Sequence, residues 1–410
     1  MFERLKNKLT FTQTYYYSAL LFVFSISLSR AAISFFVLWF VFLFLIEGNF
    51  KAFYQKIKKI HALKVIGIYI AYMFISVLWS NDISHALGVM RLYAYWIIIP
   101  ILVVKLKKQW VTQLITAFLL GMLLSEVLAY GIFFELWAFN GRGPEYPSPF
   151  MFHIHYSLFL ATVAIVLLNR LLSDKYTLLA KIPMSVFFLT SVGNLFISTG
   201  RTGQLAFLVS TFIAVVIHYR LTLKAFIIYL SLSTVLFVGA YYTISSFEKR
   251  INFAVADIQK LQEGNYNTSW GIRVAYWMIA YNIVKEDPLL GVGIGDDNEA
   301  AKYVLQNYEL GFSEEVKQWC STHHFHNQYL TVLVQGGLIG FALMIWLFVT
   351  LYRLKIKDAE LRQQNILMLS VFVVSAIAEP LWIVQFPIIL FVLIAVSSII
   401  SAQEDAEANI

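Results

Sequence analysis

Long apolar runs separated by short polar segments dominate the chain. A run of about 20 apolar residues is long enough to cross a lipid bilayer as a helix. The last two runs are separated only by a turn near Gln385 and are also compatible with one re-entrant pair. The pattern predicts an all-α integral membrane protein of about twelve transmembrane helices. The twelve expected spans are 14–29, 31–47, 65–80, 88–104, 110–137, 153–169, 182–198, 203–218, 225–245, 328–352, 366–384 and 386–401.

One long segment, residues 246–327, interrupts this pattern between the ninth and tenth spans. Its acidic residues outnumber its basic ones, and it is not of low complexity. We therefore expect a small helical domain outside the bilayer, and one integrated protein in which residues 1–245 hold spans one to nine and 328–410 hold spans ten to twelve with a short tail. The helices expected within the segment are 247–262, 270–285, 297–309 and 313–319.

The composition excludes a soluble protein. The 410 residues are 59% hydrophobic and 13% charged, with a mean hydropathy of +0.70, whereas soluble domains carry roughly 25% charged residues. A net charge of +7 alone would suit a nucleic-acid partner. Its cationic residues instead lie in short clusters between apolar runs, which is typical of membrane topology. A second apolar run follows the first directly, so we expect the first 30 residues to be a retained helix and not a cleaved leader.

The distribution of basic residues predicts the orientation. If the N-terminus is cytoplasmic, most of the 31 Lys and Arg residues fall in cytoplasmic segments, as the positive-inside rule requires. Both termini are then cytoplasmic, and the long segment lies on the outer face. The single cysteine, Cys320, rules out an internal disulfide framework.

Three polar stretches then lie on the outer face, the first being FISTGRTGQLAF at residues 196–207. Ser198, Thr199 and Thr202 are possible helix caps, and the two glycines of the stretch allow a tight turn. The next helix would begin here with free backbone N–H groups beside Arg201, which is favourable for binding an anion. The alternative is a capped turn whose arginine extends toward the membrane surface.

The second stretch, residues 267–297, predicts a helix followed by a glycine-rich loop. Ser269 is a suitable N-cap, and the pair Asp287–Pro288 ends the helix. Arg273 in the first turn is poorly placed for the helix dipole, which suggests another partner; the alternative is an ordinary surface arginine. The glycines of GVGIG follow a helix and not a strand, so they do not form a dinucleotide fingerprint. Asp296–Asp297 are either ligands of a divalent ion or simply solvated.

The third stretch, CSTHHFHNQYLTVLVQGGLIG at residues 320–340, places three histidines at the start of the tenth span. His326 can titrate near neutral pH and accept a proton. Cys320 and His323 lie close enough in sequence to His326 to raise zinc as an alternative, and a purely structural histidine is a third. The glycines of the stretch permit close helix packing.

Taken in order, the Gly-Arg turn, the helix with S-x-x-x-R and DPLLGVGIG, and HNQYLTVLVQGGLIG resemble the O-antigen ligase and O-antigen polymerase family of bacterial envelope glycosyltransferases. The resemblance covers roughly residues 190–350, with fainter similarity at 76–92 and 147–157. It implies a C-type membrane glycosyltransferase (GT-C) fold in the bacterial inner membrane and a metal-independent reaction without a cofactor. The implied reaction, at the periplasmic face, transfers a glycan from undecaprenyl pyrophosphate to an acceptor hydroxyl.

The resemblance also implies roles for individual residues. The essential histidine of the family matches His326, and its two essential arginines match Arg201 and Arg273, which would bind the pyrophosphate. The crowding of His323 and His324 leaves open which imidazole is essential. The further candidates for substrate contacts are His324, Asn327, Arg91 and Arg142.

The chemistry of these residues agrees with that reaction. Guanidinium groups pair with phosphate oxygens in a bidentate geometry, and an imidazole can take the proton of the attacking hydroxyl. The histidine could equally hold the pyrophosphate as a cation, and a single displacement would invert the anomeric centre.

We favour a ligase whose acceptor is a sugar of lipid A-core, with a polymerase that joins lipid-linked repeats as the alternative. Two other classes remain open: a transporter of the lipid-linked glycan, and a receptor or scaffold. A transporter is disfavoured because the charged residues collect on one face and not along a path through the spans.

Overall fold

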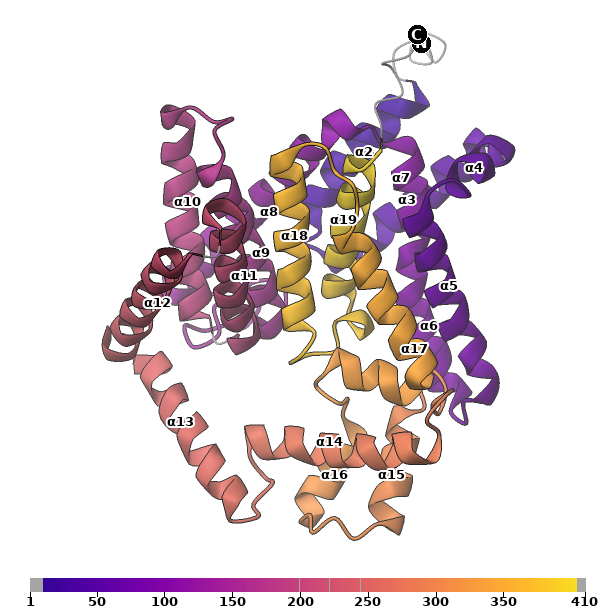
Figure 1. Ribbon diagram of the computed structural model, residues 1–410, viewed down its shortest axis with the longest axis vertical. Coiled ribbons are helices and arrows are strands. Elements are labelled where there is room, and N and C mark those ends of the chain that lie inside the picture. The colour runs from indigo at the N-terminus through magenta and orange to yellow at the C-terminus, as the bar shows by residue number, and fades with distance from the viewer. Residues whose placement is uncertain (1–9, 199, 221, 244, 404–410) are drawn as a thin grey trace.

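The structure, a computed structural model, describes residues 10–403 except 199, 221 and 244 (Figure 1). All of its regular elements in that part of the chain are helices, which confirms the all-α prediction. The first part of the bundle is formed by α2 (Phe11–Ser25), α3 (Arg30–Glu47), α4 (Phe50–Ile57), α5 (His61–Ile75), α6 (Ile83–Tyr93), α7 (Ile98–Lys105) and α8 (Val111–Phe133). It continues with α9 (His153–Leu172), α10 (Leu178–Ile197), α11 (Arg201–Tyr219), α12 (Leu223–Thr243), α17 (Gln328–Tyr352), α18 (Ala359–Ser375) and α19 (Gln385–Ser401).

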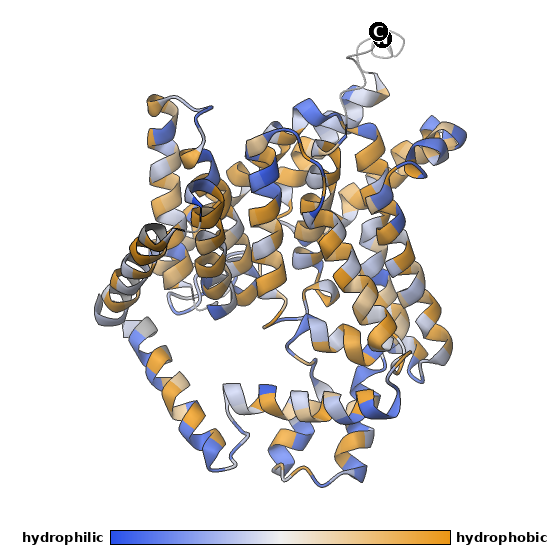
Figure 2. Cartoon of the chain, viewed as in Figure 1, coloured by the Kyte–Doolittle hydropathy of each residue, from blue (hydrophilic) through white to orange (hydrophobic). Residues whose placement is uncertain are grey.

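Nine helical segments among the described residues are long and apolar enough to cross a membrane, so the chain is an integral membrane protein. Figure 2 shows apolar residues along the helices of the bundle. Three of the expected spans correspond to shorter helices: α2 has 15 residues, and α18 and α19 have 17 each. The total of twelve spans therefore stays a prediction.

The expected continuous span 366–384 is wrong. Helix α18 ends at Ser375, and the chain passes through a non-helical segment and the short 3-10 helix η4 (Leu381–Ile383) before α19 begins. Pro380 disfavours helical geometry at the residue before it, which is Glu379. The break is tied to the start of α17 because Gln328 donates its backbone N–H to the Ala376 carbonyl at 2.8 Å and accepts from Trp382 N at 2.8 Å.

The loop between the ninth and tenth expected spans contains four helices, close to the predicted bounds. They are α13 (Ser245–Gln262), α14 (Ser269–Glu286), α15 (Asp297–Asn307) and α16 (Glu314–Thr322). Helix α14 packs against the other three and against α17, so this domain is fastened to the bundle. The N-cap prediction is wrong by one residue, because Thr268 and not Ser269 accepts from the Gly271 backbone N–H. Asp287 ends the helix as predicted.

The glycine-rich segment between α14 and α15, residues 287–296, packs against α17; we call this segment the strap. The helical path of α17 is interrupted at Gly337, whose φ is +61°. Leu338 N then donates to the Pro288 carbonyl at 2.9 Å, and Gly293 N donates to the Gln335 carbonyl at 2.9 Å. A Cβ added at Gly291 would lie 2.4 Å from the Val334 carbonyl oxygen, so glycine is required for this close approach. The GVGIG motif therefore serves backbone packing.

Helix α9 is the centre of the bundle and packs against α8, α10, α11, α18 and α19. Its contact with α11 is close: a Cβ added at Gly200 would lie 2.2 Å from Ser157 Oγ, and one at Gly203 would lie 2.2 Å from the Ser157 carbonyl oxygen. Ser157 Oγ also accepts the Gly203 N–H at 3.1 Å. The start of α11 is thereby fixed on α9, without the predicted side-chain cap from its own turn. Thr199, one of those expected caps, lies outside the described residues.

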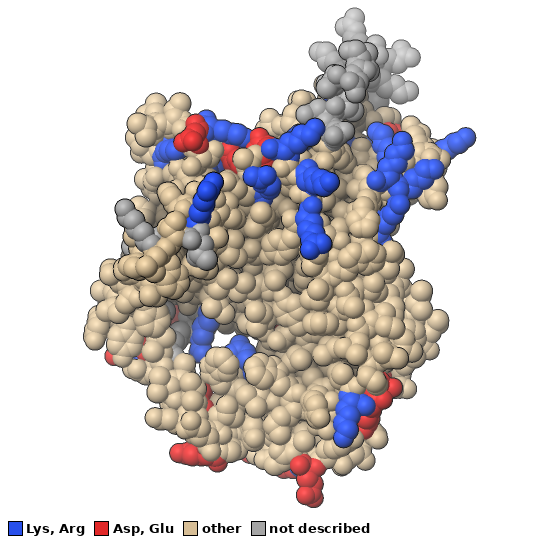
Figure 3. Space-filling model, in the orientation of Figure 1, with Lys and Arg blue, Asp and Glu red and all other residues tan. Residues whose placement is uncertain are grey.

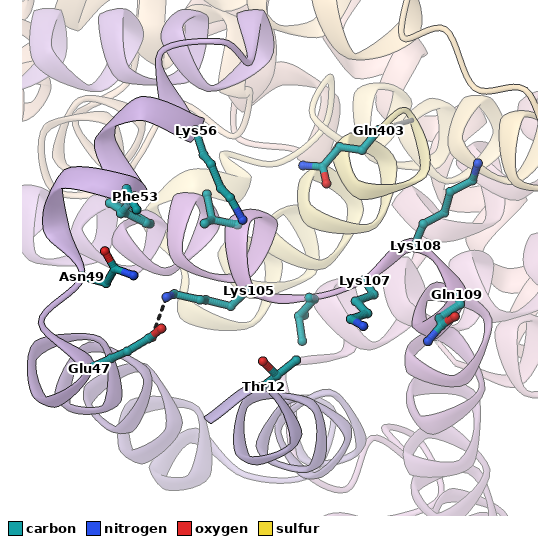
Figure 4. A pocket seen from close by; sticks show the side chains of 13 residues that line it. Thr12, Glu47, Asn49, Phe53, Lys56, Lys105, Lys107, Lys108, Gln109 and Gln403 are labelled. Carbon is teal, nitrogen blue, oxygen red and sulfur yellow. Dashed lines mark ion pairs between the residues drawn. The ribbon is translucent and has the colours of Figure 1, made fainter. Parts of the chain in front are cut away.

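Charged residues are segregated between the two ends of the molecule. In Figure 3, Lys and Arg gather at the end that holds α4, and Asp and Glu are prominent at the end that holds α14–α16. A pocket of about 410 Å³ at the basic end is lined by four lysines, Lys56, Lys105, Lys107 and Lys108 (Figure 4). Thr12 and Gln403, near the two ends of the described chain, also line it. Both ends therefore lie on one face, as the orientation requires; the terminal residues themselves lie outside the described range.

Candidate active site

His326 occupies a constrained turn between α16 and α17. Its φ of +48° is uncommon for a residue other than glycine, and such backbone is often found at functional sites. Two neighbours hold the turn in place. Phe325 is buried and contacts the ring of Tyr276 at 5.0 Å between centroids, and Asn327 starts α17 by accepting from the N–H groups of Tyr329 and Leu330 at 2.8 and 3.1 Å.

The carboxylate of Glu379 lies at the centre of a group of three histidines. His326 Nδ1 is 3.5 Å from Glu379 Oε2, and His155 Nε2 and His324 Nε2 are 3.5 and 3.8 Å from Oε1. The three imidazoles come from the start of α9 and from the turn before α17, while Glu379 comes from the break after α18. We call these four residues the histidine–glutamate cluster.

The cluster contains a buried anion and at least one neutral imidazole at pH 7. Glu379 is only 3% exposed, and burial alone would raise its pKa. The close approach of the His155 and His326 rings, together with the charge that His324 carries at low pH, outweighs this effect and lowers the pKa of Glu379 to about 2. Burial also lowers the pKa of His324, to about 4, although the carboxylate of Glu379 acts in the opposite direction. His324 is therefore uncharged near neutral pH and can accept a proton or a hydrogen bond.

The two predicted arginines lie near this cluster and near each other. Arg273 is in the first turn of α14, with its guanidinium 5.9 Å from the centre of the Trp270 ring. Arg201 is the exposed first residue of α11. Burial lowers the pKa of Arg273, the positive charge of Arg201 lowers it further, and Glu379 partly offsets both. Arg273 thus lies within electrostatic reach of both Arg201 and Glu379, and the same carboxylate is 3.5 Å from His326 Nδ1.

This arrangement favours an anionic ligand. Arginine stays protonated in proteins, so two close guanidinium groups repel each other, and burial adds to the energetic cost of their charge. A diphosphate placed between them would relieve both effects and accept bidentate hydrogen bonds. The space-filling view in Figure 3 shows an opening between the outer helices and the bundle, with basic side chains at its edge.

The ligand atoms of His324, His326 and Glu379 lie within 4.8 Å of one another, so these residues could hold a metal ion. Two imidazoles and a carboxylate are a donor set that zinc accepts. The expected zinc alternative of Cys320, His323 and His326 does not assemble. Cys320 is fully buried beside Tyr276, burial raises the pKa of its thiol to about 12, and the His323 ring is stacked on Trp319 at 3.8 Å.

The other predicted substrate contacts have varied surroundings. Asn327 has a structural function, because its Oδ1 caps α17. Arg142 lies in a turn of the 134–152 loop, where its N–H donates to the Phe139 carbonyl at 2.9 Å, and none of the described contacts brings it to the cluster. Arg91 lines a separate cavity that also reaches His324. Asp296 and Asp297 are 1% and 4% exposed, so the interpretation of this pair as solvated is wrong.

Sequence reasoning missed Glu379 and His155. Glu379 was placed inside an expected span, yet it is the one Asp, Glu, Lys or Arg between Arg362 and Glu404. An ionisable residue in such an apolar region is by default a candidate for function, so a signal was present. His155 lies in the stretch 147–157, whose similarity to the family was noted without assigning it a role.

The fold and the site together describe an integral membrane protein with two arginines beside a histidine–glutamate cluster. Comparison with known proteins agrees: residues 186–345 match the family model described as O-antigen ligase. Residues 186–345 are therefore similar to the O-antigen ligase family, in agreement with the resemblance found in the sequence. Members of this family are glycosyltransferase-like enzymes of O-antigen assembly.

A second comparison finds a Haemophilus influenzae protein, described as uncharacterized, that is 30% identical over 219 residues. The alignment covers 51% of this chain and 52% of that protein, so the chain spans about half the length of the relative it matches. The segment matched by the family model contains Arg201, Arg273 and His326. His155 and Glu379 lie outside it, so the cluster combines residues of the matched segment with residues beyond it.

Proposed function

We propose that this protein is an O-antigen ligase of the bacterial inner membrane. It transfers a glycan from undecaprenyl pyrophosphate to a sugar hydroxyl of lipid A-core, with the active site on the periplasmic face and both termini in the cytoplasm. The reaction needs neither a metal ion nor a cofactor. The fold is of the C-type membrane glycosyltransferase class.

The observation that carries the proposal is the convergence of two arginines and a histidine–glutamate cluster from separate elements. Arg201 comes from α11, Arg273 from α14 and His326 from the turn before α17, and the charges of Arg201 and Glu379 both act on Arg273. A glycosyl pyrophosphate needs these two functions together: cationic groups for the leaving group and a base for the nucleophile. The family match over residues 186–345 supports the same assignment.

In the proposed step, the acceptor hydroxyl oxygen forms a bond to the anomeric carbon while the bond from that carbon to the pyrophosphate oxygen breaks. The hydroxyl proton passes to the imidazole of His326. Undecaprenyl pyrophosphate leaves with the bonding electron pair, and Arg201 and Arg273 stabilise its charge. Glu379 stabilises the imidazolium that forms, as an orienting carboxylate does for other catalytic histidines. A single displacement of this kind inverts the anomeric configuration.

The experiment that tests the function is a lipopolysaccharide gel. The host makes its lipid-linked O-antigen and lipid A-core but lacks its own ligase, and this protein is supplied from a plasmid. We expect a restored ladder of O-antigen on lipid A-core. Longer lipid-linked chains without a ladder would instead identify the alternative, an O-antigen polymerase. A transporter of the lipid-linked glycan would produce neither change.

A further inference from the structure

A second polar cavity borders the histidine–glutamate cluster on the side of His324. It has a volume of about 680 Å³ and lies between α6, α15, α17 and the turn that follows α16. Its lining includes Arg91 and His85 from α6, and Asn298, Asp297 and Gln335 from the opposite side. His324 therefore faces both this cavity and the carboxylate of Glu379, whose Oε1 lies 3.8 Å from its Nε2.

The buried wall of the cavity presents oxygen atoms that need hydrogen-bond donors. Gln335 is 1% exposed, and its Nε2 donates to Asp297 Oδ1 at 2.8 Å, which fixes the orientation of the amide. Its Oε1 is buried and has no hydrogen-bond partner among the described residues, and the same holds for Asn298 Oδ1. Buried polar atoms in proteins are nearly always paired, so two unpaired acceptors in one cavity point to a ligand that donates hydrogen bonds.

The mouth of the cavity carries charged groups of both signs. Arg91 and His85 are both exposed there, on α6. The carboxylate of Asp82 lines the same cavity, and its Oδ1 accepts from the His85 backbone N–H at 2.9 Å. A ligand suited to this site has several hydroxyl groups, which can donate to the oxygen atoms of the wall and form hydrogen bonds with the polar side chains at the mouth. A carbohydrate with O–H donors fits, whereas an apolar lipid chain does not.

We propose that this cavity is the subsite for the acceptor sugar. Hydroxyl groups of the acceptor donate to Gln335 Oε1 and Asn298 Oδ1 and orient the sugar so that its reacting hydroxyl meets the cluster from the side of His324. The donor diphosphate then lies on the side of the two arginines, and the histidine–glutamate cluster lies between the two substrates. This assignment rests on the proposed transfer function and adds the location and the chemistry of acceptor recognition.

The test measures the Michaelis constants for both substrates with purified full-length protein, undecaprenyl-pyrophosphate-linked glycan as donor and lipid A-core as acceptor. Asn298→Ala should raise the KM for lipid A-core on the order of five- to tenfold, the effect of one lost hydrogen bond, with the KM for the donor unchanged. Asn307→Ala is the matched control, because Asn307 is an exposed asparagine of the same helix whose Nδ2 donates to the Tyr303 carbonyl. Gln335→Met removes the second unpaired acceptor of the wall and should also raise the KM for lipid A-core.

An unchanged acceptor KM in Asn298→Ala, or a raised donor KM in its place, would overturn the acceptor subsite while leaving the ligase function standing. If the wild-type protein transfers nothing, the ligase function fails, and the subsite is judged by direct binding of lipid A-core in detergent micelles. Weaker binding of lipid A-core to Asn298→Ala than to Asn307→Ala would then support the sugar subsite, and equal binding would contradict it.

Discussion

Glu379 is positioned to act on three imidazoles at once, with Oε2 3.5 Å from His326 Nδ1 and Oε1 facing His155 and His324. Its pKa of about 2 means that it stays ionised throughout the pH range in which histidines titrate. A permanent carboxylate favours the protonated form of a neighbouring imidazole and fixes the orientation of its ring. We therefore regard Glu379 as a positioning residue for His326.

Glu379→Gln should reduce kcat on the order of 10²-fold, because the imidazolium formed during transfer loses its charged partner. The control is Glu309→Gln, at an exposed glutamate of the outer segment 246–327, and it should leave the rate unchanged. A folded Glu379→Gln protein with the same kcat as Glu309→Gln would contradict this role.

Arg273→Ala should lower kcat/KM on the order of 10²- to 10³-fold, because the leaving pyrophosphate loses a preorganised cationic donor. Arg273→Lys should recover little of this loss, since an ammonium cannot reproduce the bidentate geometry of guanidinium. Lys285→Ala removes an exposed cation from the last turn of the same helix and should leave the rate unchanged. Equal activities of Arg273→Ala and Lys285→Ala in a transfer assay would remove Arg273 from the site.

The metal-binding geometry of His324, His326 and Glu379 gives a direct test of the metal-independent mechanism. Because the proposed step uses the imidazole as a base, a bound cation would block it. Transfer should persist after treatment with EDTA and should be inhibited by added zinc. Loss of transfer in EDTA, with recovery on adding zinc, would instead assign a functional metal site to these residues.

At the scale of elements, the strap after α14 determines where the site is assembled. It pairs its backbone with the broken turn of α17 at Gly337 and contacts the loop between α5 and α6, where Asp296 accepts from Asn81 Nδ2 at 2.9 Å and from Asp82 N at 3.0 Å. These contacts join the outer domain to the bundle. Arg273 precedes the strap in sequence and His326 follows it, so the position of the strap affects the distance between these two side chains.

Gly337→Ala should destabilise the protein by about 3 kcal/mol or more, because a Cβ at φ +61° would lie 2.3 Å from the Leu289 carbonyl oxygen. Gly311→Ala is the matched control, with φ +70° but nothing within 4 Å of the added atom. It should cost only about 1 kcal/mol of backbone strain. Thermal unfolding in detergent compares the two, and equal melting temperatures would show that the strap contact does not matter for stability.

The elements could be predicted largely from the sequence, and the reasons are local. The apolar pattern and the residues that end helices predicted the bounds of the four outer helices to within a few residues. The pair Asp287–Pro288 marked the end of α14. Predictions failed where tertiary contacts override local pattern. Helix α18 ends at Ser375 within the span expected to continue to 384. Pro380 was a local signal for this break, but the bonds from Gln328 to Ala376 and from Trp382 to Gln328 that hold it are tertiary, and no local periodicity reports them.

The candidate site was predicted in part. Arg201, Arg273 and His326 were placed from motifs, and the structure brings them together. Glu379 and His155 could not be assigned a partner because they are brought to His326 by the packing of α18 and α9, far away in sequence. The role of Asn327 as a cap was likewise hidden, since the same residue type serves for caps and for substrate contacts.

At the scale of the whole molecule, charge segregation sets the orientation in the membrane. Lysines and arginines gather at the end near α4, and the site lies toward the end with α14–α16 (Figure 3). The positive-inside rule predicts that the basic end is cytoplasmic and that the site faces the periplasm, as proposed above. Both lipid-linked substrates would then present their sugars on the side where the cluster lies.

Cysteine labelling tests this orientation. The native Cys320 is fully buried and should react little, so single cysteines can be introduced on the natural background. Glu314→Cys, at a side chain that is 85% exposed, should react with a membrane-impermeant maleimide in intact spheroplasts. Lys355→Cys, between α17 and α18, should react only after permeabilisation. The opposite pattern would reverse the assigned topology.

The central claim, that the arginine pair and His326 carry out glycan transfer, is tested most directly by a reconstituted reaction. Purified protein is mixed with donor and lipid A-core, and both the glycosylated product and the released undecaprenyl pyrophosphate are quantified. We predict equal amounts of the two from the wild type, and on the order of 1% of that amount or less from Arg201→Ala, Arg273→Ala or His326→Ala proteins that remain folded. Transfer at the wild-type rate by the folded His326→Ala protein would contradict the assignment of the base.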